Sequence, residues 1–179
     1  MLLYILIAVA AIVVIFVIVV ASQSETMRIE RSIIIDAPAS VPFELVSNMR
    51  AWQQWSPFEA LDPQMEHTYS GPASGVGSAT AWKGNKKAGE GAMIVTDARE
   101  YELVLIKLDF FKPFRATNTA EFIFKRQGDQ TLVTWAMLGK KNFMFKAVHM
   151  LMNMDKMLGN DFNRGLAKLK VVSEAGPQA

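Results

Sequence analysis

Hydrophobic and polar positions divide the chain into three parts with different patterns. Residues 2–21 carry no charge and are nearly all Ile, Val, Leu, Ala or Phe. From residue 28 to about residue 138, short apolar or alternating runs are separated by glycine-rich or polar turns. After residue 142 the apolar residues recur at steps of three or four. This order predicts one apolar helix, a series of strands with a short helix, and a long amphipathic helix.

The apolar N-terminal segment has the length of a membrane-spanning helix. A helix needs about 20 apolar residues to cross about 30 Å of hydrocarbon, and residues 2–21 supply them. A cleaved signal peptide is the alternative, with Val19 and Ala21 as its small-residue site before Ser22. No basic residue precedes the segment, and its apolar run exceeds the usual length of roughly 7 to 15 residues in signal peptides. The pattern therefore favours a single-pass anchor over residues 1–21.

Charges beside this helix predict its orientation. No Lys or Arg precedes it, whereas Arg28 and Arg31 follow it closely, and the positive-inside rule then places the following domain in the cytoplasm. Residues 22–27 form a polar connector, which spans only about 20 Å when extended. We expect a domain over residues 28–174 that lies against the cell membrane, and a disordered tail over residues 175–179.

The middle of the chain predicts an antiparallel sheet. Residues 28–36 alternate as a strand does, and Ser40 and Pro42 suit the start of a helix over residues 41–49. Further strands are predicted over residues 64–70, 76–83, 89–98, 101–111, 115–126 and 131–138. Their short turns cannot join parallel neighbours, so these six strands should form a meander.

The C-terminal part predicts one long helix over residues 142–173. Its apolar face comprises Phe143, Ala147, Met150, Met154, Leu158, Phe162, Gly165, Leu169 and Val172. These positions recur at helical spacing, so this face should pack on the sheet.

Several short motifs, taken in this order, resemble the SRPBCC superfamily, in particular its polyketide cyclase/dehydrase and START-like lipid-transport branch. They are Ala37-Pro38, the segment WQQWSPF from Trp52, Tyr69-Ser-Gly71, Ala81-Trp82-Lys-Gly84, Gly128 with residues 131–135, and Gly165-Leu-Ala-Lys-Leu169. The resemblance implies an α+β helix-grip fold, in which a curved antiparallel sheet wraps around the C-terminal helix. It also implies a cavity between sheet and helix that binds an apolar or amphipathic molecule.

Large aromatic and methionine side chains are the candidates for lining such a cavity. Four tryptophans are many for one domain of this size, and a flexible methionine fills adaptable apolar surfaces. Ordinary core packing is the alternative interpretation. In the last strand, alternation places Val133, Trp135 and Met137 on the concave face. The candidate ligand-binding residues are Trp52, Trp55, Phe58, Trp82, Trp135, Met137, Met150, Met154 and Leu158.

Candidate catalytic groups are few. Among them are His67 and its neighbours Glu66 and Tyr69, which are weak candidates for general acid or base, while His149 lies on the long helix. The chain has no cysteine and only two histidines, so neither a metal site nor a cofactor is predicted. The stretch GPASGVGS from Gly71 lacks the Lys-Ser/Thr ending of a phosphate-binding loop and predicts a hairpin turn.

Net charge and composition leave three hypotheses. The net charge of +2 comes from scattered residues, which argues against nucleic-acid binding. The first hypothesis is a membrane-anchored module that binds a lipid, isoprenoid or polyketide-like molecule. The second is an enzyme similar to polyketide cyclases and dehydratases. The third is a non-catalytic accessory subunit whose helix docks on a membrane-protein partner. The scarcity of polar candidates favours binding over catalysis.

Overall fold

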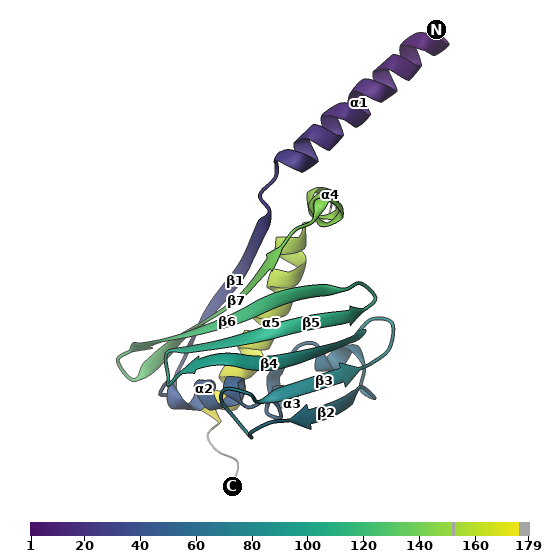
Figure 1. Ribbon diagram of the computed structural model, residues 1–179. Coiled ribbons are helices and arrows are strands. Elements are labelled where there is room, and N and C mark those ends of the chain that lie inside the picture. The colour runs from purple at the N-terminus through teal and green to yellow at the C-terminus, as the bar shows by residue number, and fades with distance from the viewer. Residues whose placement is uncertain (152, 176–179) are drawn as a thin grey trace.

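The chain folds into an α+β domain from which one N-terminal helix projects (Figure 1). The computed structural model describes residues 1–151 and 153–175, with the backbone alone at residues 149 and 151. The helices are α1 (Leu2–Ser22), α2 (Ser40–Ser47), α3 (Trp52–Trp55), η1 (Glu59–Leu61), α4 (Phe143–Leu151) and α5 (Met154–Glu174). The strands are β1 (Thr26–Ile35), β2 (Glu66–Ser70), β3 (Ala79–Lys83), β4 (Glu90–Arg99), β5 (Leu103–Lys112), β6 (Ala116–Gln127) and β7 (Gln130–Lys140).

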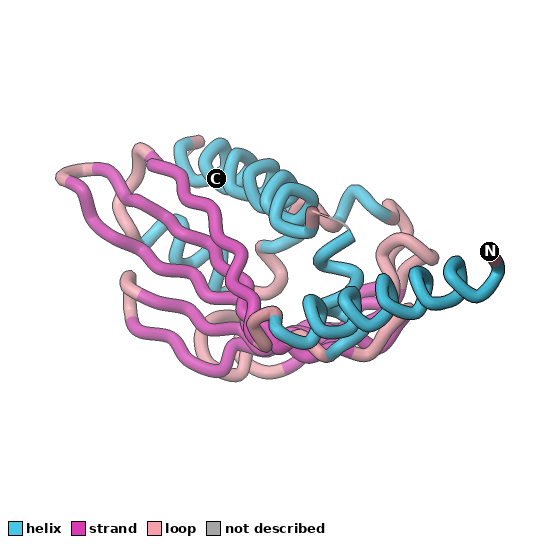
Figure 2. The backbone as a smooth tube through the Cα atoms, turned by 90° about the horizontal axis from the view of Figure 1, so that it is seen from above, coloured by secondary structure: helices cyan, strands magenta, loops and turns pink. Residues whose placement is uncertain are grey.

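One antiparallel sheet contains all seven strands in the order β1-β7-β6-β5-β4-β3-β2. The strands β2 to β7 form the predicted meander, and β1 pairs with β7 as an edge strand of the sheet. The sheet is curved, and the long helix α5 lies on its concave side (Figure 2). This arrangement is the helix-grip fold that the sequence predicts. The largest shift in a strand start is at β3, because the turn before it extends through Gly75 and Gly77, which both have positive φ.

The prediction of one continuous C-terminal helix is wrong. Two helices occupy this region, and Asn153 caps the second one, since its side chain accepts a hydrogen bond of 2.9 Å from the backbone N–H of Lys156. Helix α4 contacts α1, whereas α5 contacts β1, α2 and α3. The chain therefore changes direction between two packing surfaces, although the apolar periodicity continues through the break. The tryptophan segment, expected as a loop, also forms the short helix α3.

An aromatic cluster fills the interior around the middle and C-terminal part of α5. Trp135 stacks on Phe162 with ring centroids 4.2 Å apart and on Phe122 at 5.1 Å. Trp52 and Trp55 from α3 meet Trp135 edge-on. A Cβ at Gly165 would lie 2.8 Å from both Pro57 and Trp135, so helix and sheet approach closely only because this residue is glycine. This part of the interior is solid.

The connector between α1 and the sheet is shorter than the predicted residues 22–27. It comprises only residues 23–25, because Thr26 already pairs with Lys140 of β7. Its last residue is also fixed, since the backbone N–H of Lys141 donates a hydrogen bond of 2.7 Å to the carbonyl of Glu25. Helix α1 is long and apolar enough to cross a membrane and is almost wholly exposed. Membrane anchors and signal sequences both have helices of this kind.

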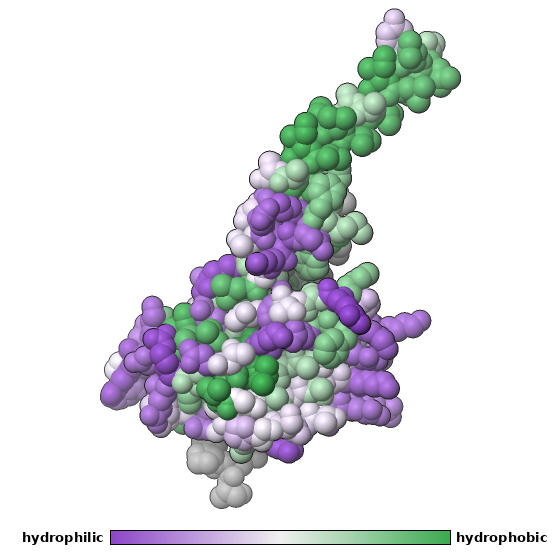
Figure 3. All heavy atoms as spheres, viewed as in Figure 1, coloured by the Kyte–Doolittle hydropathy of each residue, from purple (hydrophilic) through white to green (hydrophobic). Residues whose placement is uncertain are grey.

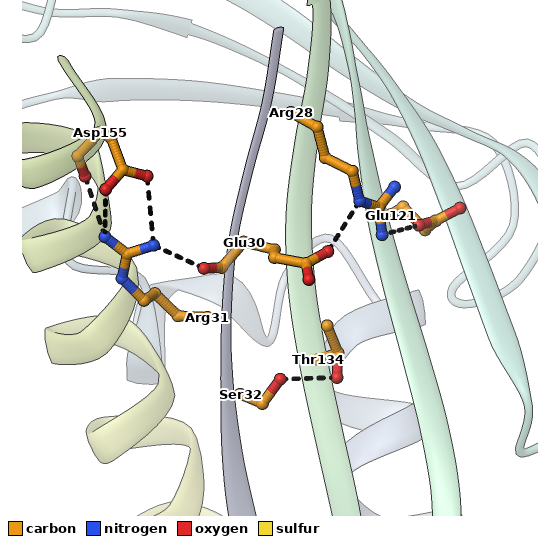
Figure 4. A network of polar contacts seen from close by, with 7 residues as sticks. All are labelled: Arg28, Glu30, Arg31, Ser32, Glu121, Thr134 and Asp155. Carbon is orange, nitrogen blue, oxygen red and sulfur yellow. Dashed lines mark hydrogen bonds and ion pairs between the residues drawn. The ribbon is translucent and has the colours of Figure 1, made fainter.

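Polar contacts tie β1 to its neighbours on both sides (Figure 4). Arg31 forms an ion pair of 3.0 Å with Asp155 at the start of α5. Arg28 reaches across to Glu121 of β6 at 2.8 Å and to Glu30 at 2.7 Å, and these hydrogen bonds raise the pKa of Arg28. The two arginines that predict the orientation of α1 thus also link β1 to β6 and to the start of α5.

Candidate functional site

A cavity of about 360 Å³ lies between the concave face of the sheet and the first two turns of α5. This volume falls in the range of about 300 to 1,000 Å³ typical of small-molecule sites. Its wall is mostly apolar: Met93, Leu108 and Phe110 come from the sheet, and Phe145 comes from α4. Such a wall favours an apolar ligand, because each Å² of apolar surface removed from water contributes roughly 25 cal/mol.

The structure brings most of the predicted ligand-binding residues to this cavity. Those that line it are Trp52, Phe58, Trp82, Trp135, Met137, Met154 and Leu158. Val133 is buried in the core on the same face of β7 as Trp135 and Met137, as the alternation predicts. Whether the lining residues bind a ligand stays a prediction.

Two of the predicted ligand-binding residues lie away from the cavity. Trp55 is fully buried in the aromatic cluster, where its indole N–H donates to the carbonyl of Leu45 at 3.0 Å. The short helix α3 turns this ring into the core, which a loop assignment does not show. Met150 is exposed on α4, because the break before α5 separates it from the face that carries Met154.

Two tryptophan rings are oriented by their own backbone contacts. The indole N–H of Trp52 donates to Val46 at 2.9 Å, and that of Trp82 donates to Ala88 at 3.2 Å. With these N–H groups satisfied, the rings contribute apolar surface to the wall. Gly91 pairs with Trp82 across the sheet, and a side chain at this glycine would collide with the indole ring. The glycine thereby lets Trp82 lie flat over β4.

One polar pair stands in this apolar wall. The Nε2 atom of His67 on β2 lies 3.0 Å from a carboxylate oxygen of Glu59 in η1, and both side chains line the cavity. The His67 side chain is only 11% exposed and that of Glu59 26%. The His67 ring also stacks on Tyr69 with centroids 5.9 Å apart. Burial and the nearby Glu59 raise the pKa of Tyr69, although the Arg50 guanidinium over its ring acts in the opposite direction.

The structure separates the three weak catalytic candidates. His67 lies in the cavity wall, and Tyr69 lies behind it in the same strand. Glu66 is exposed and pairs in register with Lys83. Its side chain faces away from the cavity, because alternate residues of a strand point to opposite faces. Glu59 is the acidic partner that sequence reasoning missed, since an irregular segment joins it to β2. The side chain of His149 lies outside the part of the chain that is described.

Metal ligands are not grouped in the described part of the chain. Among the side chains that the structure describes, which leave out that of His149, no three of His, Cys, Asp or Glu lie close enough together to hold a metal ion.

An antiparallel sheet curved around a C-terminal helix, with an apolar cavity between them, defines a helix-grip ligand-binding module. The sequence profile of the family described as polyketide cyclase / dehydrase and lipid transport matches residues 26–174, and the chain belongs to this family. None of the curated protein sequences matches the chain.

Solved structures share the fold at low sequence identity. The Aha1 dimer from Colwellia psychrerythraea is 17% identical with a TM-score of 0.60, and the match covers 84% of this chain and 98% of that one. Two di-domain ARO/CYC proteins are also similar. For BexL from the BE-7585A biosynthetic pathway, identity is 12%, the TM-score is 0.63, and coverage is 88% of this chain and 53% of that one. For StfQ from the steffimycin biosynthetic pathway, identity is 7%, the TM-score is 0.62, and coverage is 84% of this chain and 51% of that one. This chain therefore spans about half the length of each ARO/CYC protein.

Proposed function

We propose that this protein is a membrane-anchored module that holds a hydrophobic or amphipathic small molecule, such as a lipid, an isoprenoid or a polyketide-like compound, in its cavity. The observation that carries the proposal is the apolar cavity of about 360 Å³ beside the buried aromatic core. A folded domain loses dispersion contacts wherever its interior is unfilled. A space of this size is thus consistent with a role in binding.

A cavity-filling variant with a matched control tests the binding proposal. Met154 lines the cavity, whereas Met157 on the same helix is exposed. We expect Met154→Trp to lower the affinity for a fluorescent fatty acid by about tenfold or more, which corresponds to about 1.4 kcal/mol. The Met157→Trp variant should bind as the wild type does. Equal binding by both variants would contradict the proposal, and a wild type that takes up no apolar probe would favour the accessory-subunit hypothesis.

Membrane anchoring is the second part of the proposal. It is supported by the exposed apolar surface of α1 and by the connector of three residues that holds the domain beside it. A chain without residues 1–24 should leave the membrane fraction, and the intact chain should keep its full mass. A mature N-terminus at Ser22 would instead identify a signal peptide. We also propose a cytoplasmic domain, so a reporter fused after Ala179 should be active only in the cytoplasm.

The pair of Glu59 and His67 favours one alternative, an enzyme of the cyclase or dehydratase kind. A carboxylate and an imidazole at hydrogen-bond distance in an apolar wall can move a proton to or from a bound molecule. The test compares molecules extracted from the wild type, from Glu59→Gln, and from the control Glu66→Gln, whose side chain faces away from the cavity. A compound heavier by one water that accumulates only on Glu59→Gln would support a dehydratase. The same compound on all three proteins would support binding alone.

A further inference from the structure

One end of the sheet carries both the connector to α1 and the entry to α4. The strand register shows this, because Thr26 pairs with Lys140, Gly139 with Asn118, and Ala116 with Phe110. The turn between β3 and β4 lies at the same end, since Glu90 pairs with both Lys83 and Lys112. We call residues 23–27, 84–89, 111–116 and 139–148 the proximal end; α1 leaves the domain from it (Figure 1).

Helix α4 presents an exposed apolar face at the proximal end. Phe143, Met144 and Val148 are all exposed, and the Met144 side chain reaches 74%. At 100° per residue, positions 143, 144, 147 and 148 fall within about 140° of the helix circumference. None of them is charged. Lys146 points to the other side, where it is buried and donates a hydrogen bond of 3.4 Å to the carbonyl of Ala21.

The end of β5 and the turn that follows it add further exposed aromatic side chains. Phe114 is 79% exposed and Phe111 is also exposed. Scattered surface hydrophobics are ordinary, but apolar residues gathered on one helix and an adjacent turn mark an interaction surface. Apolar residues also cover α1, and hydrophilic residues gather where α1 joins the domain (Figure 3).

The proximal end is also strongly basic. Its basic residues outside the buried Lys146 are Lys86, Lys87, Lys112, Arg115, Lys140 and Lys141, and Glu25 is the single acidic residue within these ranges. From outside them, the Asp62 carboxylate accepts a hydrogen bond of 2.7 Å from the backbone N–H of Asn85. One of the six, Lys112, forms an ion pair with Glu90 just outside the proximal end at 2.8 Å. At the opposite end the charges are mixed at two turns, with Arg99, Glu100 and Glu102 at one and Arg126 and Asp129 at another. A basic rim around an apolar face is the pattern that binds anionic lipid surfaces.

We infer that the proximal end is a binding surface for an anionic bilayer, with the apolar face of α4 inserted at the boundary between headgroups and acyl chains. The occupant follows from the position of α1, which enters the same bilayer from the same end. This step rests on the membrane anchoring proposed above. The basic residues then meet the lipid headgroups, while Phe114 and Met144 enter the apolar layer.

The mouth of the cavity lies at this surface. Several residues that line the cavity are themselves exposed, and those at the proximal end are Lys87, Lys112, Pro113 and Phe114. Phe145 of α4 lines the cavity as well, on the side of the helix away from Phe143. The cavity thus takes a molecule dissolved in the bilayer, which enters between α4 and the turn between β5 and β6 without crossing water.

Depth-dependent quenching tests the surface on the full chain. The native chain has no cysteine, so Met144→Cys and the control Asp129→Cys at the opposite end each give one labelling site. In nanodiscs that contain phosphatidylglycerol, a fluorophore at position 144 should be quenched by nitroxide lipids and shielded from iodide. The label at position 129 should show the reverse. Equal iodide quenching at both positions would overturn the inference, as would equal lipid quenching at position 144 in discs of phosphatidylcholine alone.

A loading experiment separates this inference from the proposed function. Met144→Asp should slow the uptake of a fluorescent fatty acid from anionic vesicles by about tenfold, the factor expected when one apolar side chain no longer inserts. Its equilibrium affinity in detergent should equal that of the wild type. Unchanged loading with unchanged affinity would overturn the membrane entry route and leave the binding function standing. A wild type that binds no probe in detergent would refute the binding function, while the quenching result would still report on the surface.

Discussion

The two ends of helix α5 pack against the same sheet with opposite results. From its middle towards its C-terminal end Phe162, Leu166 and Leu169 are fully buried in the core. At its N-terminal end Met154 and Leu158 border the cavity. The difference comes from the segment of residues 52–57, which inserts Trp55 and Pro57 beneath the C-terminal part and leaves the other part unfilled. In this helix-grip fold, the space between sheet and helix is therefore filled or left open according to the side chains that one connecting segment places there.

Alanine substitutions along α5 give the largest test of this difference. We expect Phe162→Ala to lower the free energy of unfolding by about 3 to 5 kcal/mol, because it removes a ring stacked at 4.2 Å on Trp135. Leu158→Ala should cost less than about 2 kcal/mol, below the usual range for such a change, because its side chain already borders an empty space. Urea unfolding of the full chain in detergent, followed by tryptophan fluorescence, measures both. Similar losses would show that the two ends are packed alike.

Overpacking at the close approach of helix and sheet is the next test. Gly165→Ala should destabilise the protein by about 1 to 3 kcal/mol, because the new methyl group would meet Pro57 and Trp135 at 2.8 Å. The exposed Lys168 on the same helix provides the control, and Lys168→Ala should change stability by less than about 0.5 kcal/mol. A neutral Gly165→Ala variant would mean that the solid end has more room than its geometry indicates.

The ion pair between β1 and the start of α5 should contribute little. The side chains of Arg31 and Asp155 are 27% and 58% exposed, so solvent screens their attraction. A double-mutant cycle with Arg31→Gln and Asp155→Asn should give a coupling energy of about 0.2 to 1 kcal/mol. A coupling well above this range would show that polar contacts, more than packing, hold α5 over the cavity.

The smallest effect is expected at the far end of α5, where Glu174 accepts hydrogen bonds from Lys170 and from the backbone N–H of Asp36. These bonds lower the pKa of Glu174 from its ordinary value of 4.5. A carboxylate whose pKa is lower in the folded state stabilises that state above the ordinary pKa, and this is lost as the pH falls through the lowered value. Glu174→Gln should therefore be less stable than the wild type at pH 7 and equal to it in strong acid, as measured by thermal unfolding across pH. A constant difference across pH would contradict this assignment.

The fold was predictable because its signals are local and repeated. Alternation and turn chemistry define β2 to β7, and antiparallel pairing follows from the short turns. The break between α4 and α5 was not predictable from periodicity, because the apolar spacing is the same on both sides of it. Asn153 was the available signal, since a capping residue inside an apolar helical pattern indicates a new start.

The site was predictable in its apolar part only. Trp135 and Met137 follow from strand alternation, which fixes the face of each side chain, whereas Trp82 was chosen as a large aromatic ring. The pairing of Glu59 with His67 depends on the path of an irregular segment, and no periodic rule gives that path. Strand alternation alone does separate Glu66 from His67 and Tyr69. Trp55 and Met150 were misplaced because each depends on where a helix begins or ends.

The connector of three residues fixes the rotation of the domain about α1. Hydrogen bonds from Lys141 to Glu25 and from Lys146 to Ala21 hold both of its ends, and Val20 of α1 is buried. In the proposed membrane arrangement the domain cannot rotate about its anchor. Each face of α1 therefore keeps a constant orientation relative to the domain. A second transmembrane helix that associates with one side of α1 would consequently meet the cavity mouth at one constant angle, and alanine insertions after Gln23 would turn the domain away from it.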